Sequence, residues 1–319
     1  MPRREVALRS TTRIPVKPWK NRLLAAVTVP LLLVGCKTTG AKIAASAFTG
    51  SGGTFARDED PELVRDAVPF ALKTMESLLV TIPDDVDLLT ALTANFTQYA
   101  YAFVQQDADI AEMEGRTAEA KAGRERARKL FLRARDYGLR GLEELYPGIS
   151  DRLRSARDLG PELARVKPAD ADLLYWTAAA WALAIADGKS DMQLVAELPA
   201  PVAMMRRGLA LDPTFDRGAF DEFFVTYEGG RPVADGGGPA VARMHLERAL
   251  ALSGGKKLGV RVSWAETVLV QQQDRAAFEA ELRRVLAFDV DSAPEFRLAN
   301  LIAQRRARAL LAHTDDLFA

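Results

Sequence analysis

Residues 172–181 read DLLYWTAAAW, and the stretch Leu173–Ala186 is apolar on almost every side. A helix of this composition must be buried or must line an apolar cavity. Its opening Asp-Leu-Leu recurs at residues 87–89, and an aromatic residue, Trp181 or Phe96, stands nine positions after the aspartate in each copy. This recurrence indicates a protein built from repeated apolar helices.

A second phrase, rich in Arg, Leu and Ala, ends the expected partner helices. It stands at residues 207–213, 248–252 and 284–289, with a looser copy at 140–147. Its leucines at 209, 250 and 286 are 41 and 36 positions apart, more than the regular tetratricopeptide period of about 34. Because one helix pair cannot bury its apolar face alone, neighbouring pairs stack and leave a concave surface or a central channel. We therefore predict an all-α fold of degenerate tetratricopeptide-like repeats, a solenoid of helix pairs.

The rest of the body also has helical periodicity. Asp60-Pro61 predicts a helix start, followed by an apolar face that includes Leu63 and Phe70, and Pro69 should kink or split this helix. A long helix is expected at about 117–146, and no stretch alternates as a half-buried strand would. Longer loops are expected in three places, at about residues 107–118, 187–200 and 229–239.

The first 35 residues have the composition of an export signal. Seven basic residues and one acid lie before an apolar run, Leu23–Val34, which is short for a membrane-spanning helix of about 20 residues. Leu33-Val34-Gly35-Cys36 is similar to a lipobox, where bacteria attach a lipid to the cysteine thiol. We predict a signal peptide (1–35), lipidation of Cys36, a flexible tether (36–56) and a helical domain (57–319). The alternative is an uncleaved apolar anchor with an incidental cysteine.

The single cysteine and the charge exclude several classes of protein. Cys36 is the only cysteine, so no intrachain disulfide can form, and a lipidated thiol cannot serve catalysis. Removal of residues 1–35 leaves 36 basic and 42 acidic residues. This net charge near −6 argues against nucleic acid as a partner. Lys37, where an aspartate would retain a lipoprotein in the inner membrane, favours the periplasmic face of the outer membrane.

Few side chains suggest catalysis or metal binding. His245 and His313 are far apart and lack the two-histidine spacing of a zinc site, so both are interpreted as surface or helix-end residues. The glycines at 229–230 and 236–238 lack the strand and lysine of a phosphate loop. Seven basic residues between Lys121 and Arg135 indicate a solvated helix face or a docking surface. We predict no enzyme activity, no metal and no cofactor beyond the lipid.

Aromatic residues are the better candidates for a binding site. At helical spacing such residues usually form the core, but apolar ligand pockets are lined by the same side chains. The candidates for lining a pocket or channel are Tyr175, Trp176, Trp181, Phe223, Phe224, Tyr227 and Trp264.

Three phrases together resemble the TatT family, the tetratricopeptide-type lipoproteins associated with TRAP transporters. They are Leu174–Trp181, the loop and helix leading to Arg248-Ala249-Leu250, and the C-terminal Leu310-Leu311 with Asp316-Leu317-Phe318. The resemblance covers roughly residues 36–319. It implies a non-catalytic lipoprotein that binds the transporter's substrate-binding protein (the P component) and accepts or hands over a small hydrophobic or amphipathic ligand. It also implies a hydrophobic channel and assembly as a homotrimer.

Two other functions remain open at this point. A repeat-built lipoprotein of outer-membrane assembly would bind proteins and no small molecule. An enzyme would require clustered polar groups in a deep pocket, and no such cluster is apparent in the sequence.

Overall fold

The computed structural model describes residues 41–42, 45, 54–155, 157 and 159–318 of the chain. The expected signal peptide, Cys36 and most of the expected tether lie outside these residues. The described part is all helical, with no strand, and this confirms the all-α prediction. None of its helices is both long enough and apolar enough to cross a membrane.

The helices follow one another along the chain with short connections. The first half contains η2 (Thr54–Arg57), α2 (Pro61–Leu79), α3 (Val86–Tyr99), the π-helical η3 (Ala100–Gln105), α4 (Gln106–Met113), α5 (Thr117–Leu145), α6 (Ile149–Ser155), α7 (Leu159–Ala164) and η4 (Pro168–Asp170). The second half begins with α8 (Ala171–Asp187), α9 (Met192–Ala196), α10 (Pro199–Leu211), η5 (Phe215–Arg217), α11 (Ala219–Gly229), η6 (Val233–Asp235) and α12 (Pro239–Ser253). It ends with α13 (Gly259–Trp264), the π-helical η7 (Ala265–Leu269), α14 (Arg275–Ala287), η8 (Val290–Ser292), η9 (Pro294–Phe296), α15 (Arg297–Ala312) and α16 (Thr314–Leu317).

Helix α2 begins as predicted but buries only part of the predicted apolar face. The Asp60 carboxylate accepts hydrogen bonds from the backbone N–H groups of Glu62 and Leu63, both at 3.0 Å, which satisfies donors that a helix start leaves free. Leu63 and Phe70, expected in the core, are 59% and 78% exposed. The buried face consists of Val64, Val68, Leu72, Met75 and Leu79. Pro69 neither splits nor ends the helix, because the buried residues around it hold both halves against α3.

Two of the three expected loops contain helices. Residues 107–113 form most of α4, where Asp107 pairs with Arg65 and Asp109 pairs with Arg124. Residues 187–200 contain α9 and the start of α10. Only 229–239 is mainly a turn region, in which Gly236 and Gly238 have φ angles of 82° and 101° that favour glycine.

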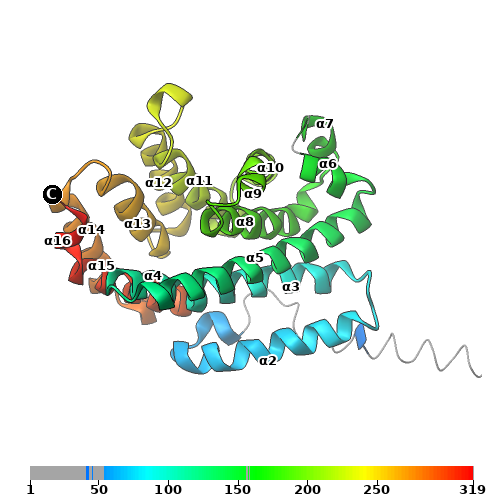
Figure 1. The fold of residues 1–319 in the computed structure, drawn as a ribbon, viewed down its shortest axis with the longest axis horizontal. Coiled ribbons are helices and arrows are strands. Elements are labelled where there is room, and N and C mark those ends of the chain that lie inside the picture. The colour runs from blue at the N-terminus through cyan, green and yellow to red at the C-terminus, as the bar shows by residue number, and fades with distance from the viewer. Residues whose placement is uncertain (1–40, 43–44, 46–53, 156, 158, 319) are drawn as a thin grey trace, which may run out of the picture.

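Helix α5 is the central rod of the molecule and packs between α3 and α8 (Figure 1). A Cβ atom on Gly138 of α5 would lie only 2.1 Å from Thr177 Oγ1 of α8, so glycine allows this close approach. The apolar residues form three successive clusters: around α2, α3 and α5, then around α8, α10 and α11, and finally around α12 to α15. This serial arrangement is typical of a helical repeat protein.

The last helices return to the first, so the packed helices form a closed ring. Starting at α4, each neighbour contacts the next through α5, α8, α10, α11, α13 and α15, and α15 contacts α4 again. Asp107 of α4 links the two ends of the chain: Arg65 Nη2 lies 3.1 Å and Arg305 Nη2 lies 2.6 Å from its Oδ1. In addition, Arg297 donates to the carbonyl of Arg57 at 3.1 Å.

Candidate functional site on the inner face of the ring

Tyr101 is a partly exposed aromatic residue that lies among charged side chains of other elements. Tyr101 on η3 exposes 45% of its surface, yet burial among surrounding protein raises the pKa of its hydroxyl to about 12. The charges of Glu266, Arg306 and Glu222 all act on this hydroxyl. Tyr101 therefore lies near the charged side chains of η7, α15 and α11, with part of its own side chain exposed to solvent.

Tyr175 of α8 lies near the same group of residues. Burial raises the pKa of Tyr175 well above its usual value, and the nearby Glu222 and Tyr101 raise it further. We call Tyr101, Tyr175, Glu222, Glu266 and Arg306 the inner face. These five residues come from five elements, so only the closed fold brings them together.

Two inner-face residues lie on π-helical segments. Tyr101 is in η3, which connects α3 directly to α4, and Glu266 is in η7, which continues α13 and ends at a turn. A π turn shifts the direction of the following side chains, and such turns are frequent at functional sites. The spacing of a regular α-helix, used to predict helix faces from the sequence, does not predict these π-helical segments.

The charges on the inner face are already paired. Arg306 Nε lies 2.9 Å from Glu266 Oε1, and Arg306 Nη1 lies 3.5 Å from Asp109 Oδ2. Lys257 Nζ lies 3.1 Å from Glu222 Oε1. Burial raises the pKa values of Glu222 and Glu266, although the cations beside them act in the opposite direction. The inner face thus combines two tyrosine rings with two largely buried ion pairs.

The predicted aromatic residues divide into two groups. Trp181, Phe224 and Trp264 lie in the core with 0%, 2% and 4% exposure, and Trp181 Nε1 donates to Glu197 at 2.8 Å. The structure thus places these three residues in the core, which was the alternative to lining a pocket. The four that keep exposed surface are Tyr175, Trp176, Phe223 and Tyr227.

Among these four, Tyr175 and Trp176 belong to an aromatic group at the junction of α8 and α11. The ring of Tyr175 lies 5.0 Å from that of Trp176 and 5.3 Å from that of Phe220. Phe223 and Tyr227, one turn apart on α11, stack at 5.8 Å. Of the seven predicted residues, only Tyr175 belongs to the inner face. Tyr101, the other tyrosine there, was not predicted.

His245 differs from its expected surface position. Its side chain is only 13% exposed, and Nδ1 lies 2.7 Å from Oδ1 of the fully buried Asp221. The imidazole also stacks on Phe224 with ring centroids 5.1 Å apart. His313, in contrast, lies at the end of α15 as expected. In the described residues, no group of His, Cys, Asp and Glu could hold a metal ion.

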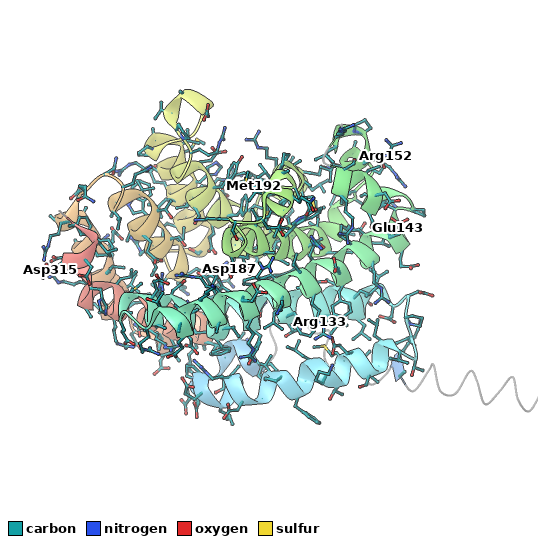
Figure 2. The ribbon with its side chains drawn as sticks, in the orientation of Figure 1. Arg133, Glu143, Arg152, Asp187, Met192 and Asp315 are labelled. Carbon is teal, nitrogen blue, oxygen red and sulfur yellow. The ribbon has the colours of Figure 1, made fainter. Side chains whose placement is uncertain are left out.

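The basic stretch on α5 is largely neutralised within the molecule. Arg124 pairs with Asp109 at 3.1 Å, Arg133 pairs with Glu76 at 3.0 Å, and Arg135 pairs with Glu197 at 3.2 Å. Arg133 lies on the outer side of the rod, above α2 (Figure 2). These contacts favour the solvated, ion-paired helix face over a docking surface.

Two depressions lie outside the inner face. One of about 260 Å³ is lined mostly by charged residues of α14 to α16, and one of about 180 Å³ lies where α2 meets α15. The larger depression is shallow, and its arginines Arg275 and Arg283 are both paired with Glu279. The inner face therefore remains our candidate, because it combines partly exposed aromatic side chains with largely buried ion pairs.

Comparison with known proteins agrees with this architecture. A family model described as TRAP transporter T-component matches residues 57–318. An uncharacterized protein of Treponema pallidum (strain Nichols) is 30% identical over 266 residues, which is 83% of this chain and 82% of that protein. The match spans the whole ring of helices, and the chain belongs to the TRAP transporter T-component family.

Proposed function

We propose that this protein is a lipid-anchored, periplasmic accessory of a TRAP-type transporter. It docks the transporter's substrate-binding protein and passes a small hydrophobic or amphipathic ligand along the inner face. The membership in the T-component family supports the transport role. The observation that carries the ligand-binding part is Tyr101, a large side chain that is 45% exposed and lies near the charges of Glu266, Arg306 and Glu222. Lipidation at Cys36, residence at the outer membrane and assembly as a homotrimer belong to the same proposal.

The inner face suits a ligand with a long apolar part. Apolar surface removed from water contributes about 25 cal/mol per Å², and Tyr101 and Tyr175 offer ring surface for this contact. The ion pairs of Glu266 and Glu222 keep their charges satisfied without a ligand. Micromolar affinity therefore requires no charged anchor.

A matched pair of substitutions tests the inner face. Tyr101→Glu places a carboxylate among the ligand-contacting rings, and Phe70→Glu makes a similar change on the outside of α2. With a fluorescent fatty-acid probe, we expect Tyr101→Glu to weaken binding at least about tenfold, since burying an unpaired polar group costs about 1–3 kcal/mol. Phe70→Glu should leave probe binding unchanged. Equal loss in both variants, or in neither, would contradict the assignment.

Partner binding is tested separately by native mass spectrometry of residues 37–319, with and without the P component encoded nearest to the gene. A stable complex, or a co-purified apolar molecule, supports the transport role. A protein that ignores this partner and the probe would favour the second candidate, an assembly scaffold with protein partners only. The observation favouring that candidate is the exposed outer surface of α2, with Leu63 and Phe70.

A further inference from the structure

The chain begins to pack into the fold only a few residues after Cys36. Ala41 and Ala45 are 8% and 3% exposed and belong to the same apolar cluster as Met75 and Leu79 of α2. Lys42 Nζ lies 4.0 Å from Asp85 Oδ2, in the turn between α2 and α3. These contacts attach Ala41, Lys42 and Ala45 to one end of the molecule.

The length of chain between Cys36 and Ala41 then limits where the lipid can lie. Five residues span at most about 18 Å, whatever conformation they adopt. Helix α5 has 29 residues, so its ends are about 42 Å apart at 1.5 Å per residue. The C-terminal part of α5 lies at the α2–α3 turn, since Arg140 donates to the Pro83 carbonyl at 3.0 Å. A lipid on Cys36 can therefore reach this end of the rod and not the other.

We propose that the end of the molecule formed by the α2–α3 turn and the C-terminus of α5 lies against the bilayer that holds the Cys36 lipid. This membrane end consists of Val80, Pro83, Arg140, Leu145 and Pro147. The opposite end, with the start of α5 and α14 to α16, then points away from the membrane (Figure 1). The inference rests on the lipid anchor of the proposed function but not on its transport role.

The surface chemistry of the membrane end fits contact with the headgroup region. Val80 is 84% exposed and Leu145 is 38% exposed, so this end offers apolar side chains to the interface, while the guanidinium of Arg140 is held by the Pro83 carbonyl. Exposed Asp84 and Glu144 balance the cations, so electrostatic attraction to anionic lipid is weak here. The short connection, not charge, sets the orientation, and we expect the orientation to persist at high salt.

Fluorescence quenching in proteoliposomes tests the orientation of the full acylated protein. Because Cys36 is the only cysteine and its thiol carries the lipid, an introduced cysteine is the only free thiol. One variant is Val80→Cys at the membrane end. The matched control is Asp315→Cys on α16 at the far end, where the side chain is 87% exposed (Figure 2). Each is labelled with bimane and reconstituted in phosphatidylcholine vesicles that contain lipids with nitroxide headgroups.

We expect quenching at residue 80 to be at least twofold stronger than at residue 315, in both low and high salt. An insertion of 20 Gly and Ser residues between Gly40 and Ala41 adds up to about 70 Å and should abolish the difference. Equal quenching at both positions, or a difference that survives the insertion, would overturn the inference. Mass analysis of the N-terminal peptide identifies the lipid separately: its absence would overturn the anchor and the orientation, whereas loss of P-component binding alone would affect only the transport role.

Discussion

Asp107 should decide whether the helices behave as a ring or as an open solenoid. Its carboxylate receives Arg65 of α2 and Arg305 of α15, at 3.1 and 2.6 Å from the same oxygen. Asp107→Ala removes both links, whereas Asp66→Ala removes an exposed carboxylate from the outside of α2. The comparison cancels most of the general effect of replacing aspartate by alanine in a helix.

The expected loss is about 1–2 kcal/mol relative to Asp66→Ala. Each partly exposed ion pair contributes about 0.2–1 kcal/mol, and losing Asp107 leaves two half-buried guanidinium groups without that partner. Burial raises the pKa of Asp107, but hydrogen bonds from Arg65 and Arg305 outweigh it, and the net pKa is lowered from 3.8. The stabilisation is therefore present above about pH 4 and is lost as the pH falls through the lowered pKa.

Hydrogen exchange distinguishes the two architectures. In a closed ring, breaking the Asp107 links frees both ends, so amides of α2 and α15 should exchange about 5–30-fold faster. In an open solenoid, each repeat depends only on its neighbours in sequence. The amide exchange rates of α15 would then not change when α4 is altered. Unchanged protection of α15 in Asp107→Ala, relative to Asp66→Ala, would refute the ring-closure reasoning.

Three further expectations concern the core and its charges. Trp181→Ala should destabilise the domain by about 3–5 kcal/mol in urea unfolding, since the indole is fully buried; a folded variant that loses only probe binding would return Trp181 to the ligand site. Gly208→Ala should destabilise by about 1–2 kcal/mol because its Cβ would lie 2.1 Å from Phe220 Cζ, whereas Gly160→Ala meets open space and should be neutral or stabilising. Burial raises the pKa of Asp187 from 3.8 to about 6, so the folded state is penalised increasingly from about pH 4 to 6. Asp187→Asn should therefore be about 1 kcal/mol more stable at pH 8 after allowance for partial exposure, with no gain below pH 4; an equal gain at both pH values would contradict this origin.

The sequence predicted the repeats well because they depend on local patterns. The two Asp-Leu-Leu segments became α3 and α8, and the long helix expected at about 117–146 is α5, Thr117–Leu145. The face of α2 was predicted less well, because apolar residues occur around much of this helix and the pattern alone did not decide which side packs on α3. Burial of Val64 and Val68, with Leu63 exposed, is a result of tertiary packing.

The sequence patterns did not predict most of the candidate site, and the reason is different. Tyr101 and Glu266 lie on π-helical segments, where side chains leave the regular helical spacing. Residues 107–118 were predicted as a loop, whereas Asp107 and Asp109 lie in α4 and pair with Arg305 and Arg306, almost 200 positions away. His245 is buried because Asp221, 24 positions earlier, lies on the neighbouring α11. For the two aspartates and for His245, the decisive contact is non-local.

The paired charges of the inner face constrain what the ring can bind. A largely buried ion pair contributes little net stability, since desolvation offsets the attraction, but removing one partner is costly. Arg306 contacts Glu266 of η7 and Asp109 of α4, so it holds together elements from both ends of the chain and fixes how the ring closes. A ligand with a strong charge would have to break this pair or remain unpaired beside it. A ligand that rests on Tyr101 and Tyr175 leaves it intact, and the inner face should therefore select for apolar surface rather than for charge.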